Sequence, residues 1–252
     1  MTIPGEIRLF SKRRLLETLR QPVWIVSELA TPLLYMLFFS PLLKNMHNPP
    51  LSSAGVLNSF VPGLLTLLAF STGMGSGWTI IHELDTGVIE RLRVTPARRF
   101  SIMMGTVLTD IIDFLVPSVL VLIISLFFGF TIHPLGLVIL LVLLCLLTAV
   151  VSAFSSSIGL IVKQIGSVAA VLTSLQLPLT LLSGILLPLS LGPVWLRAIA
   201  HINPMYYTVE ASRVLATGVL NSSETLIAFA VMIPLTILTL WWATRVYRKT
   251  VA

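Results

Sequence analysis

Charged residues are scarce in this sequence of 252 residues. Lysine, arginine, aspartate and glutamate make up 10% of it, whereas 56% of its residues are hydrophobic and the mean hydropathy is +0.99. A water-soluble domain carries about 25% charged residues, so this composition excludes an ordinary soluble globular protein. The apolar residues form runs of about twenty, the length that a helix needs to cross a bilayer. Because the runs do not alternate as β-barrel strands do, we predict an all-α integral membrane protein.

Several patterns typical of enzymes are also missing. The single cysteine, Cys145, excludes an internal disulfide and is expected to be a small packing residue. The four histidines are scattered along the chain, so we predict no metal site. No lysine follows a glycine, which excludes the phosphate-binding loop G-x-x-x-x-G-K-[ST]. The abundant serines lie where small residues help helices to pack rather than in a hydrolase pattern. We therefore expect neither an enzyme nor a cofactor site in this chain.

What the sequence does contain is the pattern of one membrane domain over 1–252. Residues 5–21 mix leucines with arginines, which predicts an N-terminal amphipathic helix in the membrane interface; the alternative is a solvated basic leader. This polar start and the length of the apolar run after it argue against a cleavable signal peptide. Six transmembrane helices follow, at about 22–43, 59–81, 105–130, 135–161, 166–188 and 225–243.

Lysine and arginine predict how these spans are oriented. If both termini are cytoplasmic, thirteen of the sixteen basic residues lie inside, and only Lys44, Arg197 and Arg213 lie outside. This is the bias that membrane insertion produces. The net charge of +6 then reflects orientation, and no nucleic-acid partner is implied. We expect a multi-pass protein of the bacterial inner membrane.

The most charged segment between two spans is 82–104, on the cytoplasmic side. Its apolar and charged residues separate onto two sides of a short helix, which would suit a surface that docks on a soluble partner. The alternative is a charged loop that only orients the chain. The pattern E-x-x-x-G-x-x-E-x-L-x-x-T-P is formed by Glu83, Gly87, Glu90, Leu92, Thr95 and Pro96.

This pattern resembles the coupling segment of ABC-2 type transporter permeases, the drug-efflux and antibiotic-resistance branch in particular. The N-terminal helix, the six spans and the segment NPMYYTVEASR, residues 203–213, are similar to that family's plan. The resemblance therefore covers essentially the whole chain. It implies that the six residues of the pattern couple the chain to a soluble ABC ATPase, and that ATP and Mg²⁺ are bound by that subunit.

The resemblance also implies a half-transporter that pairs with a second copy or a paralogue, with a homodimer expected. The wall of the pathway would be almost wholly apolar, which favours a hydrophobic or amphipathic substrate such as a drug, an antibiotic or a lipid-like compound. Export rather than import rests on the resemblance alone. Membrane lipid is the remaining expected partner.

Two intramembrane features have open interpretations. Gly73 and Gly77 form a G-x-x-x-G pair, which favours close helix packing but also suits flexibility near a helix end. Asp110 and Asp113 lie on one helical face, and carboxylates at that depth should point into the bundle. They could contact the translocation pathway or pair with cytoplasmic arginines. The simpler alternative is hydrogen bonding at the cytoplasmic end of the span.

The segment 189–223 is only half apolar and is broken at Asn203 and Pro204. The family resemblance implies a re-entrant helical hairpin that forms an outer gate before the last span; a pair of helices lying on the surface is the alternative. Aromatic residues suit the outer interface, and a glutamate and an arginine three apart can pair. The candidate gate residues are Asn203, Pro204, Tyr206, Tyr207, Glu210 and Arg213.

Together these features predict the permease subunit of an ATP-driven exporter. An alternative from another class is an ion-coupled carrier or channel that uses Asp110 and Asp113 and needs no ATPase. A membrane scaffold without transport activity is a third possibility, for which no positive feature is present. A neighbouring gene for a soluble ATPase would distinguish the first from the other two.

Overall fold

The computed structural model describes residues 3–19, 29–38, 53–88, 98–131, 133–185 and 193–250. Within these ranges every regular element is a helix and no β-strand occurs. The labelled helices are α1 (Ile3–Leu19), α3 (Ser53–Asp85), α5 (Arg99–Phe127), α6 (Pro134–Val162), α7 (Ile165–Leu181), α8 (Val194–Ala200), α9 (Pro204–Ala216) and α10 (Ser223–Thr250). A further short apolar helix covers Leu29–Phe38.

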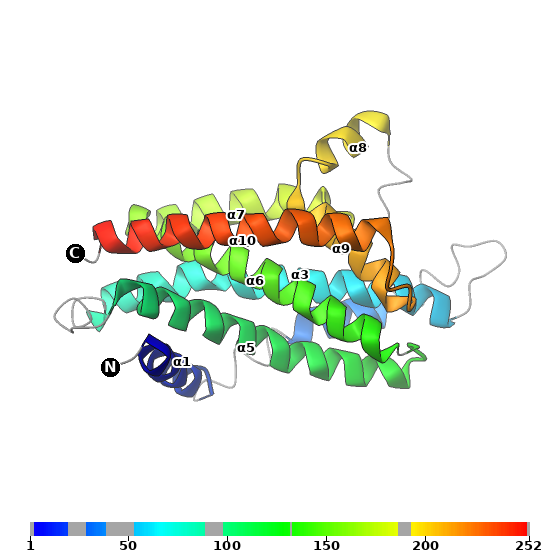
Figure 1. Ribbon diagram of the computed structural model, residues 1–252, viewed down its shortest axis with the longest axis horizontal. Helices are drawn as coiled ribbons and strands as arrows, with labels where there is room; N and C mark the ends of the chain where they lie inside the picture. Colours follow the sequence, from blue (N-terminus) through cyan, green and yellow to red (C-terminus); the bar gives the residue numbers. More distant parts are fainter. Residues whose placement is uncertain are drawn as a thin grey trace.

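Four of the described helices, α3, α5, α6 and α10, are long and apolar enough to cross a membrane. They run side by side along the long axis of the molecule (Figure 1). The all-helical class is therefore confirmed. Of the predicted first span, 22–43, the structure describes only residues 29–38, which are helical. The count of six spans remains a prediction.

Several helices differ in extent from the predicted spans, because hydropathy marks where lipid contact ends, not where a helix ends. The span predicted at 59–81 is part of the longer α3, and the one at 225–243 continues as helix to Thr250. The span at 105–130 begins earlier, at Arg99. Within the predicted span 166–188, helix α7 ends at Leu181. Pro178 lies near this end, and Gly184 adopts a φ of 75°, which breaks the helix.

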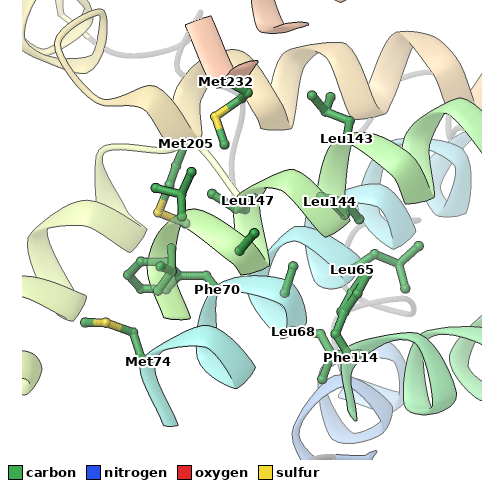
Figure 2. Close-up of a cluster of buried hydrophobic side chains, with 14 of the residues drawn as sticks. Leu65, Leu68, Phe70, Met74, Phe114, Leu143, Leu144, Leu147, Met205 and Met232 are labelled. Atoms are coloured by element: carbon green, nitrogen blue, oxygen red, sulfur yellow. The ribbon is translucent and has the colours of Figure 1, made fainter. Parts of the chain in front are cut away.

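The core lies where α3 and α6 pack together, with α5, α9 and α10 around them. Figure 2 shows Phe70 of α3, Leu147 of α6, Met205 of α9 and Met232 of α10 gathered where these helices meet, with Met74 of α3 beside them. All five side chains are buried. Fully burying such a side chain contributes about 1.5–3 kcal/mol when the reference state is water, so this cluster defines how the helices assemble.

The outer surface of the bundle is apolar, and part of its interior is polar. Leu135, Val138 and Val142 of α6 are exposed, whereas the same helix buries Ser152 and Ser155 in the packed interior. Large exposed apolar areas are rare on soluble proteins. This distribution is the one expected for helices surrounded by lipid, where small residues and hydroxyls mediate the helix contacts.

The two ends of the bundle differ in composition. Both chain termini, the end of α3, the start of α5 and the α6–α7 connection lie at one end, with α1 packed across α5 there (Figure 1). Arg14 of α1, Glu83 of α3 and Arg98 before α5 belong to these segments, and we call this end of the bundle the charged end. The connection is minimal: Lys163 closes α6 in the left-handed conformation, with a φ of 57°, and α7 follows after Gln164.

Candidate functional site

Some polar side chains of α1 are turned toward the bundle. Glu6, Ser11 and Arg14 are buried, while Leu9 and Leu16 on the other side are exposed together with Lys12. The prediction of a helix over this segment was correct, and its depth in the membrane interface stays a prediction. The polar side chains find partners on the membrane helices, and the leucines remain free to contact lipid.

Two hydrogen bonds attach α1 to α5. The Arg98 backbone N–H, at the start of α5, donates to the Glu6 carboxylate over 3.3 Å. A carboxylate at this position complements the partial positive charge of a helix N-terminus. The Ser11 hydroxyl donates to the Gly105 carbonyl at 3.2 Å. A Cβ at Gly105 would lie 2.7 Å from the Phe10 Cβ, so the glycine allows α1 to cross α5 closely.

The centre of the site is a buried ion pair between α1 and α3. Arg14 is 7% exposed and its Nε lies 3.5 Å from Oε1 of Glu83, which is 8% exposed. The Arg13 guanidinium approaches the same oxygen at 3.8 Å and also pairs with Glu17 at 3.1 Å. Glu83 lies in the last turn of α3 rather than in the loop helix that the sequence predicted. There it contacts Arg14 of α1, and its coupling role stays a prediction.

Arg14 is surrounded by carboxylates but is incompletely hydrogen-bonded. Burial by itself lowers the pKa of its guanidinium, but Glu83, Asp110 and Asp113 outweigh that effect and hold the pKa above its ordinary value. Its Nη1 and Nη2 atoms have no hydrogen-bond partner among the described residues. Arg14 is thus held mainly by charge, without the bidentate geometry that makes an arginine–carboxylate pair rigid.

Asp110 and Asp113 point to different neighbours. Asp110 is 7% exposed and accepts a hydrogen bond from the Ser152 hydroxyl of α6, which also lies 3.4 Å from the Ser76 hydroxyl of α3. Asp113 accepts from the Thr18 hydroxyl of α1 at 3.3 Å. The two carboxylates therefore connect α5 to α6 and to α1 and lie near Arg14. Their contacts are hydrogen bonds to hydroxyls of neighbouring helices, and a role in the pathway stays a prediction.

The residues of the loop pattern are only partly described. Gly87 follows α3 with a φ of 68°, and its N–H donates to the Leu84 carbonyl at 3.1 Å, while the Thr86 hydroxyl donates to the His82 carbonyl at 2.7 Å. A left-handed residue that ends a helix is usually glycine. Glu90, Leu92, Thr95 and Pro96 lie outside the described residues, so their coupling role stays a prediction.

Gly73 and Gly77 lie in the contact between α3 and α6. A Cβ at Gly73 would be 2.8 Å from the Val151 Cβ, and one at Gly77 would be 2.5 Å from the Ser155 Oγ. That hydroxyl accepts from the Gly77 N–H at 3.0 Å and donates to the Met74 carbonyl at 2.7 Å. The glycines thus bring two backbones close enough for a serine to bridge them.

The candidate gate residues lie at the other end of the bundle, where they attach α9 to the end of α7. Asn203 caps α9 by accepting from the Met205 N–H at 3.0 Å, and its Nδ2 donates to the Leu179 carbonyl at 2.8 Å. Pro204 is the first residue of α9, where its missing N–H has no structural cost. These contacts satisfy backbone groups that helix ends leave unpaired.

A second set of contacts at this end involves charge and aromatic rings. Arg213 pairs with Glu210 at 3.2 Å and donates to the Gly184 carbonyl at 2.7 Å. The rings of Tyr206 and Tyr207 pack edge to face with centroids 5.5 Å apart, and the His201 ring lies 4.9 Å from that of Tyr206. All six candidate gate residues therefore lie in one region.

The segment 189–223 is divided into two helices of different surroundings. α9 packs against α3, α6 and α10, whereas α8 stands away from the bundle (Figure 1). The break predicted at Asn203 and Pro204 is where α9 begins. The depth of either helix in a membrane is not defined by these contacts, so the re-entrant hairpin and the gate stay predictions.

Sequence reasoning missed Glu6, Ser11, Thr18 and Ser152 as members of the charged end. The sequence did contain a signal for Glu6, Ser11 and Thr18. Together with Arg14, these residues recur at helical spacing along one face of α1. The leucines and arginines of α1 are more conspicuous in the sequence than this pattern of polar residues. Ser152 had no local signal, because α6 contains many serines and only packing selects the one that contacts Asp110.

The contacts of the charged end join helices to one another. The described residues contain no group of three or more histidine, cysteine, aspartate or glutamate side chains placed to hold a metal. A buried ion pair connects α1 to the end of α3, and hydrogen bonds connect it to α5. A displacement of α1 would therefore be resisted by, and transmitted through, these contacts.

The comparisons with known proteins agree with this architecture. Residues 5–216 match the family described as ABC-2 type transporter. A putative transport permease, ycf38, of Cyanophora paradoxa is 28% identical over 219 residues, which are 83% of this chain and 73% of that protein. The inner membrane transport permease YadH of Escherichia coli K12 is 26% identical over 217 residues, covering 84% and 83% of the two chains.

A third relative is the daunorubicin resistance ABC transporter permease protein DrrB1 of Streptomyces coeruleorubidus. It is 24% identical over 199 residues, which are 78% of this chain and 70% of that protein. The family match covers most of the sequence, including α1, the charged end and α9. Four apolar helices of spanning length are consistent with it. This chain belongs to the ABC-2 type transporter family, as a multi-pass membrane permease.

Proposed function

We propose that this chain is the permease subunit of an ATP-driven exporter that moves hydrophobic or amphipathic compounds out of the cell. The observation that carries the proposal is the buried Arg14–Glu83 pair, which joins an amphipathic N-terminal helix to the first long span. Such a contact would let a force applied at the charged end reach the membrane helices. The family match supplies the transport context.

ATP would be bound and hydrolysed, with Mg²⁺, by a separate subunit, because this chain has no phosphate-binding loop. That subunit would dock at the charged end, on the loop that contains Glu90, Leu92, Thr95 and Pro96. Glu83 and Gly87 would then have a different role from those four. They would fix where the loop leaves α3, and Glu83 would transmit its movement to α1.

The motion that we propose is a rigid-body rearrangement. ATP binding would close the two ATPases and displace the loop, and the Arg14–Glu83 pair would pass this movement from the end of α3 to α1. The membrane helices would then change between an inward-open and an outward-open packing. In one of these states the contacts of the candidate gate residues, Asn203 to Arg213, would break. α9 would then separate from α7.

The proposed substrate class follows from the composition of the helices. The bundle exposes apolar side chains along its length, and a pathway between two copies would be lined by similar residues. The relative DrrB1 is named for daunorubicin resistance, which is consistent with an amphipathic substrate. We further propose a homodimer in the bacterial inner membrane, with both termini cytoplasmic, as the distribution of basic residues favours.

The ion-coupled carrier is a weaker alternative. It would need Asp110 and Asp113 to exchange a cation with water on both sides of the membrane. Asp110 is instead buried against Ser152, and Asp113 accepts from Thr18 of α1. Both carboxylates thus accept hydrogen bonds that join α5 to α6 and to α1, and both help to raise the pKa of the Arg14 guanidinium.

The experiment that tests the proposal is purification of the tagged chain from its native membrane in mild detergent, followed by mass spectrometry of bound proteins. We expect a stoichiometric soluble ATPase. Scrambling residues 89–96 should release it, whereas scrambling 44–51, an equally long loop predicted on the opposite side, should not. Recovery of the chain without an ATPase under repeated gentle extraction would contradict the proposal and favour the ion-coupled alternative.

Transport itself can be measured with the purified pair in inverted vesicles. Daunorubicin is a suitable fluorescent probe, and ATP should drive its accumulation in the vesicle lumen. Accumulation that follows an imposed proton or sodium gradient without ATP would contradict the proposed mechanism. A complex that hydrolyses ATP but moves no daunorubicin would contradict only the choice of this probe.

A further inference from the structure

A groove of about 480 Å³ lies between the start of α5 and the second half of α10, at the charged end. Phe100 lines its α5 side. The α10 side is formed by residues that share one face of the helix: Ile237, Leu240, Trp241, Thr244, Arg245 and Arg248.

The α10 face changes from apolar to basic toward the chain end. Ile237 and Trp241 are 65% and 55% exposed, and the two arginines follow one and two helical turns after the tryptophan. From Ile237 to Arg248 the helix rises about 16 Å, at 1.5 Å per residue. That length matches one leaflet, half of a hydrocarbon core of roughly 30 Å. The groove therefore has the length and polarity profile of a single phospholipid.

The arginines of the groove are available to an anion. The Arg245 guanidinium carbon lies over the Trp241 ring, 3.8 Å from its centre. An aromatic ring takes up none of the N–H donors of an arginine as a carboxylate would, so they remain able to bind phosphate oxygens in pairs. Neither Arg245 nor Arg248 takes part in an ion pair within the part of the chain that the structure describes.

We propose that this groove binds an anionic phospholipid. Its phosphate would lie on Arg245 and Arg248, and an acyl chain would lie along Trp241 and Ile237 toward the membrane centre. Basic pockets between membrane helices on the cytoplasmic side are suited to anionic headgroups. A soluble anion would leave the apolar lining unused, and a neutral lipid would leave the two arginines without a counter-charge.

The test uses the position of Trp241 in the groove. The full chain that keeps Trp241 and has phenylalanine in place of Trp24, Trp78, Trp195 and Trp242 is reconstituted in phosphatidylcholine vesicles. Brominated phosphatidylglycerol quenches indole fluorescence on contact, and brominated phosphatidylcholine at the same fraction reports non-selective contact. We expect phosphatidylglycerol to quench at a lower fraction, by about fivefold for each arginine that binds it.

Charge variants separate a specific site from general attraction. R245Q should lose part of the preference for phosphatidylglycerol, and R245Q/R248Q should lose it entirely. The matched control is R8Q/K12Q, which removes two exposed basic residues of α1 at the same end of the molecule. This control should keep the preference.

Three outcomes would overturn the proposal. The first is equal quenching by both brominated lipids, which would make the contact non-selective. The second is an equal loss of preference in R245Q/R248Q and R8Q/K12Q, which would make it a surface-charge effect. The third is a Trp241 that neither lipid reaches, which would mean that protein covers the groove.

A second measurement does not depend on the tryptophan replacements. The wild-type chain and R245Q/R248Q are extracted with equal amounts of phosphatidylglycerol and phosphatidylcholine, and native mass spectrometry counts the retained lipid. We expect retained phosphatidylglycerol on the wild-type chain and its loss in the variant. Equal retention of the two lipids by both proteins would refute the site.

Discussion

Glu83→Gln is the substitution that most directly probes the charged end. It keeps the size and the hydrogen-bonding capacity of the side chain but removes its charge. Arg14 would then keep only Asp110 and Asp113 as compensating charges, while remaining 7% exposed. The variant should therefore weaken the attachment of α1 to the bundle without disturbing the packing of α3 against α6.

The structure sets the size of this effect. Removing one partner of a buried ion pair costs about 3–5 kcal/mol. Here the contact distances are 3.5 and 3.8 Å, longer than good hydrogen bonds, and two further carboxylates remain near Arg14. We therefore expect the lower limit, about 3 kcal/mol. That corresponds to a rise of roughly 150-fold in the population with α1 detached.

Hydrogen exchange of the α1 amides in the purified full chain measures this population. The matched control is Glu17→Gln, which removes the other carboxylate that pairs with Arg13. Glu17 is 54% exposed on its side chain, and exposed pairs contribute about 0.3–0.5 kcal/mol when they lie one turn apart on a helix. Exchange in the control should therefore rise by no more than about twofold.

The reasoning would be refuted by equal exchange in the Glu83→Gln and Glu17→Gln variants. A double variant gives a second check, since Arg14→Met removes the charge that Glu83 compensates. If the two residues interact, the cost of the Arg14→Met/Glu83→Gln variant should be smaller than the sum of the single costs. Additive costs would mean that the ion pair does not hold α1.

Three further predictions concern other parts of the molecule. Gly77→Ala should destabilise the chain by about 1–3 kcal/mol, seen as a lower unfolding midpoint in detergent, because the new Cβ would lie 2.5 Å from the Ser155 Oγ; an unchanged midpoint would contradict the close packing. Asn203→Ala should cost about 1–2 kcal/mol in the same assay, since it removes the α9 cap and the hydrogen bond to the Leu179 carbonyl; Asn203→Asp, which keeps the cap alone, should lie between. Glu90→Arg should leave folding and ATPase activity intact but uncouple hydrolysis from transport in vesicles, and normal daunorubicin transport by this variant would remove the case for the loop as the coupling element.

The membrane class and the approximate positions of four spans could be predicted from the sequence. Lipid imposes a minimum length and a high apolar content on a spanning helix, and both are local properties. The ends of the helices were less predictable. Glu83 follows the apolar run of α3 and Arg248 follows that of α10, yet both belong to helices. Charge marks the membrane boundary, while the backbone continues as helix beyond it.

The site was predicted less well than the fold. Asp110 and Asp113 were identified because charge near lipid is costly, and Glu83 was identified as part of the loop pattern, but the interpretation of each stayed open. The partners decide between them, and those partners are distant in the sequence: Arg14 for Glu83, Ser152 for Asp110 and Thr18 for Asp113. No periodicity within one helix can identify such pairs.

The sequence by itself determined that this protein lies in a membrane and that it is helical. It also gave the orientation expected from the basic residues and showed that this sequence contains no phosphate-binding loop of the G-x-x-x-x-G-K-[ST] type. These properties depend on composition and on short-range pattern. Only the tertiary structure decided which polar residues of α1 turn inward, and that Arg14 is buried against Glu83. The physical reason is that a buried charge is stable only beside its counter-charge, and where that counter-charge lies is a property of the packed helices.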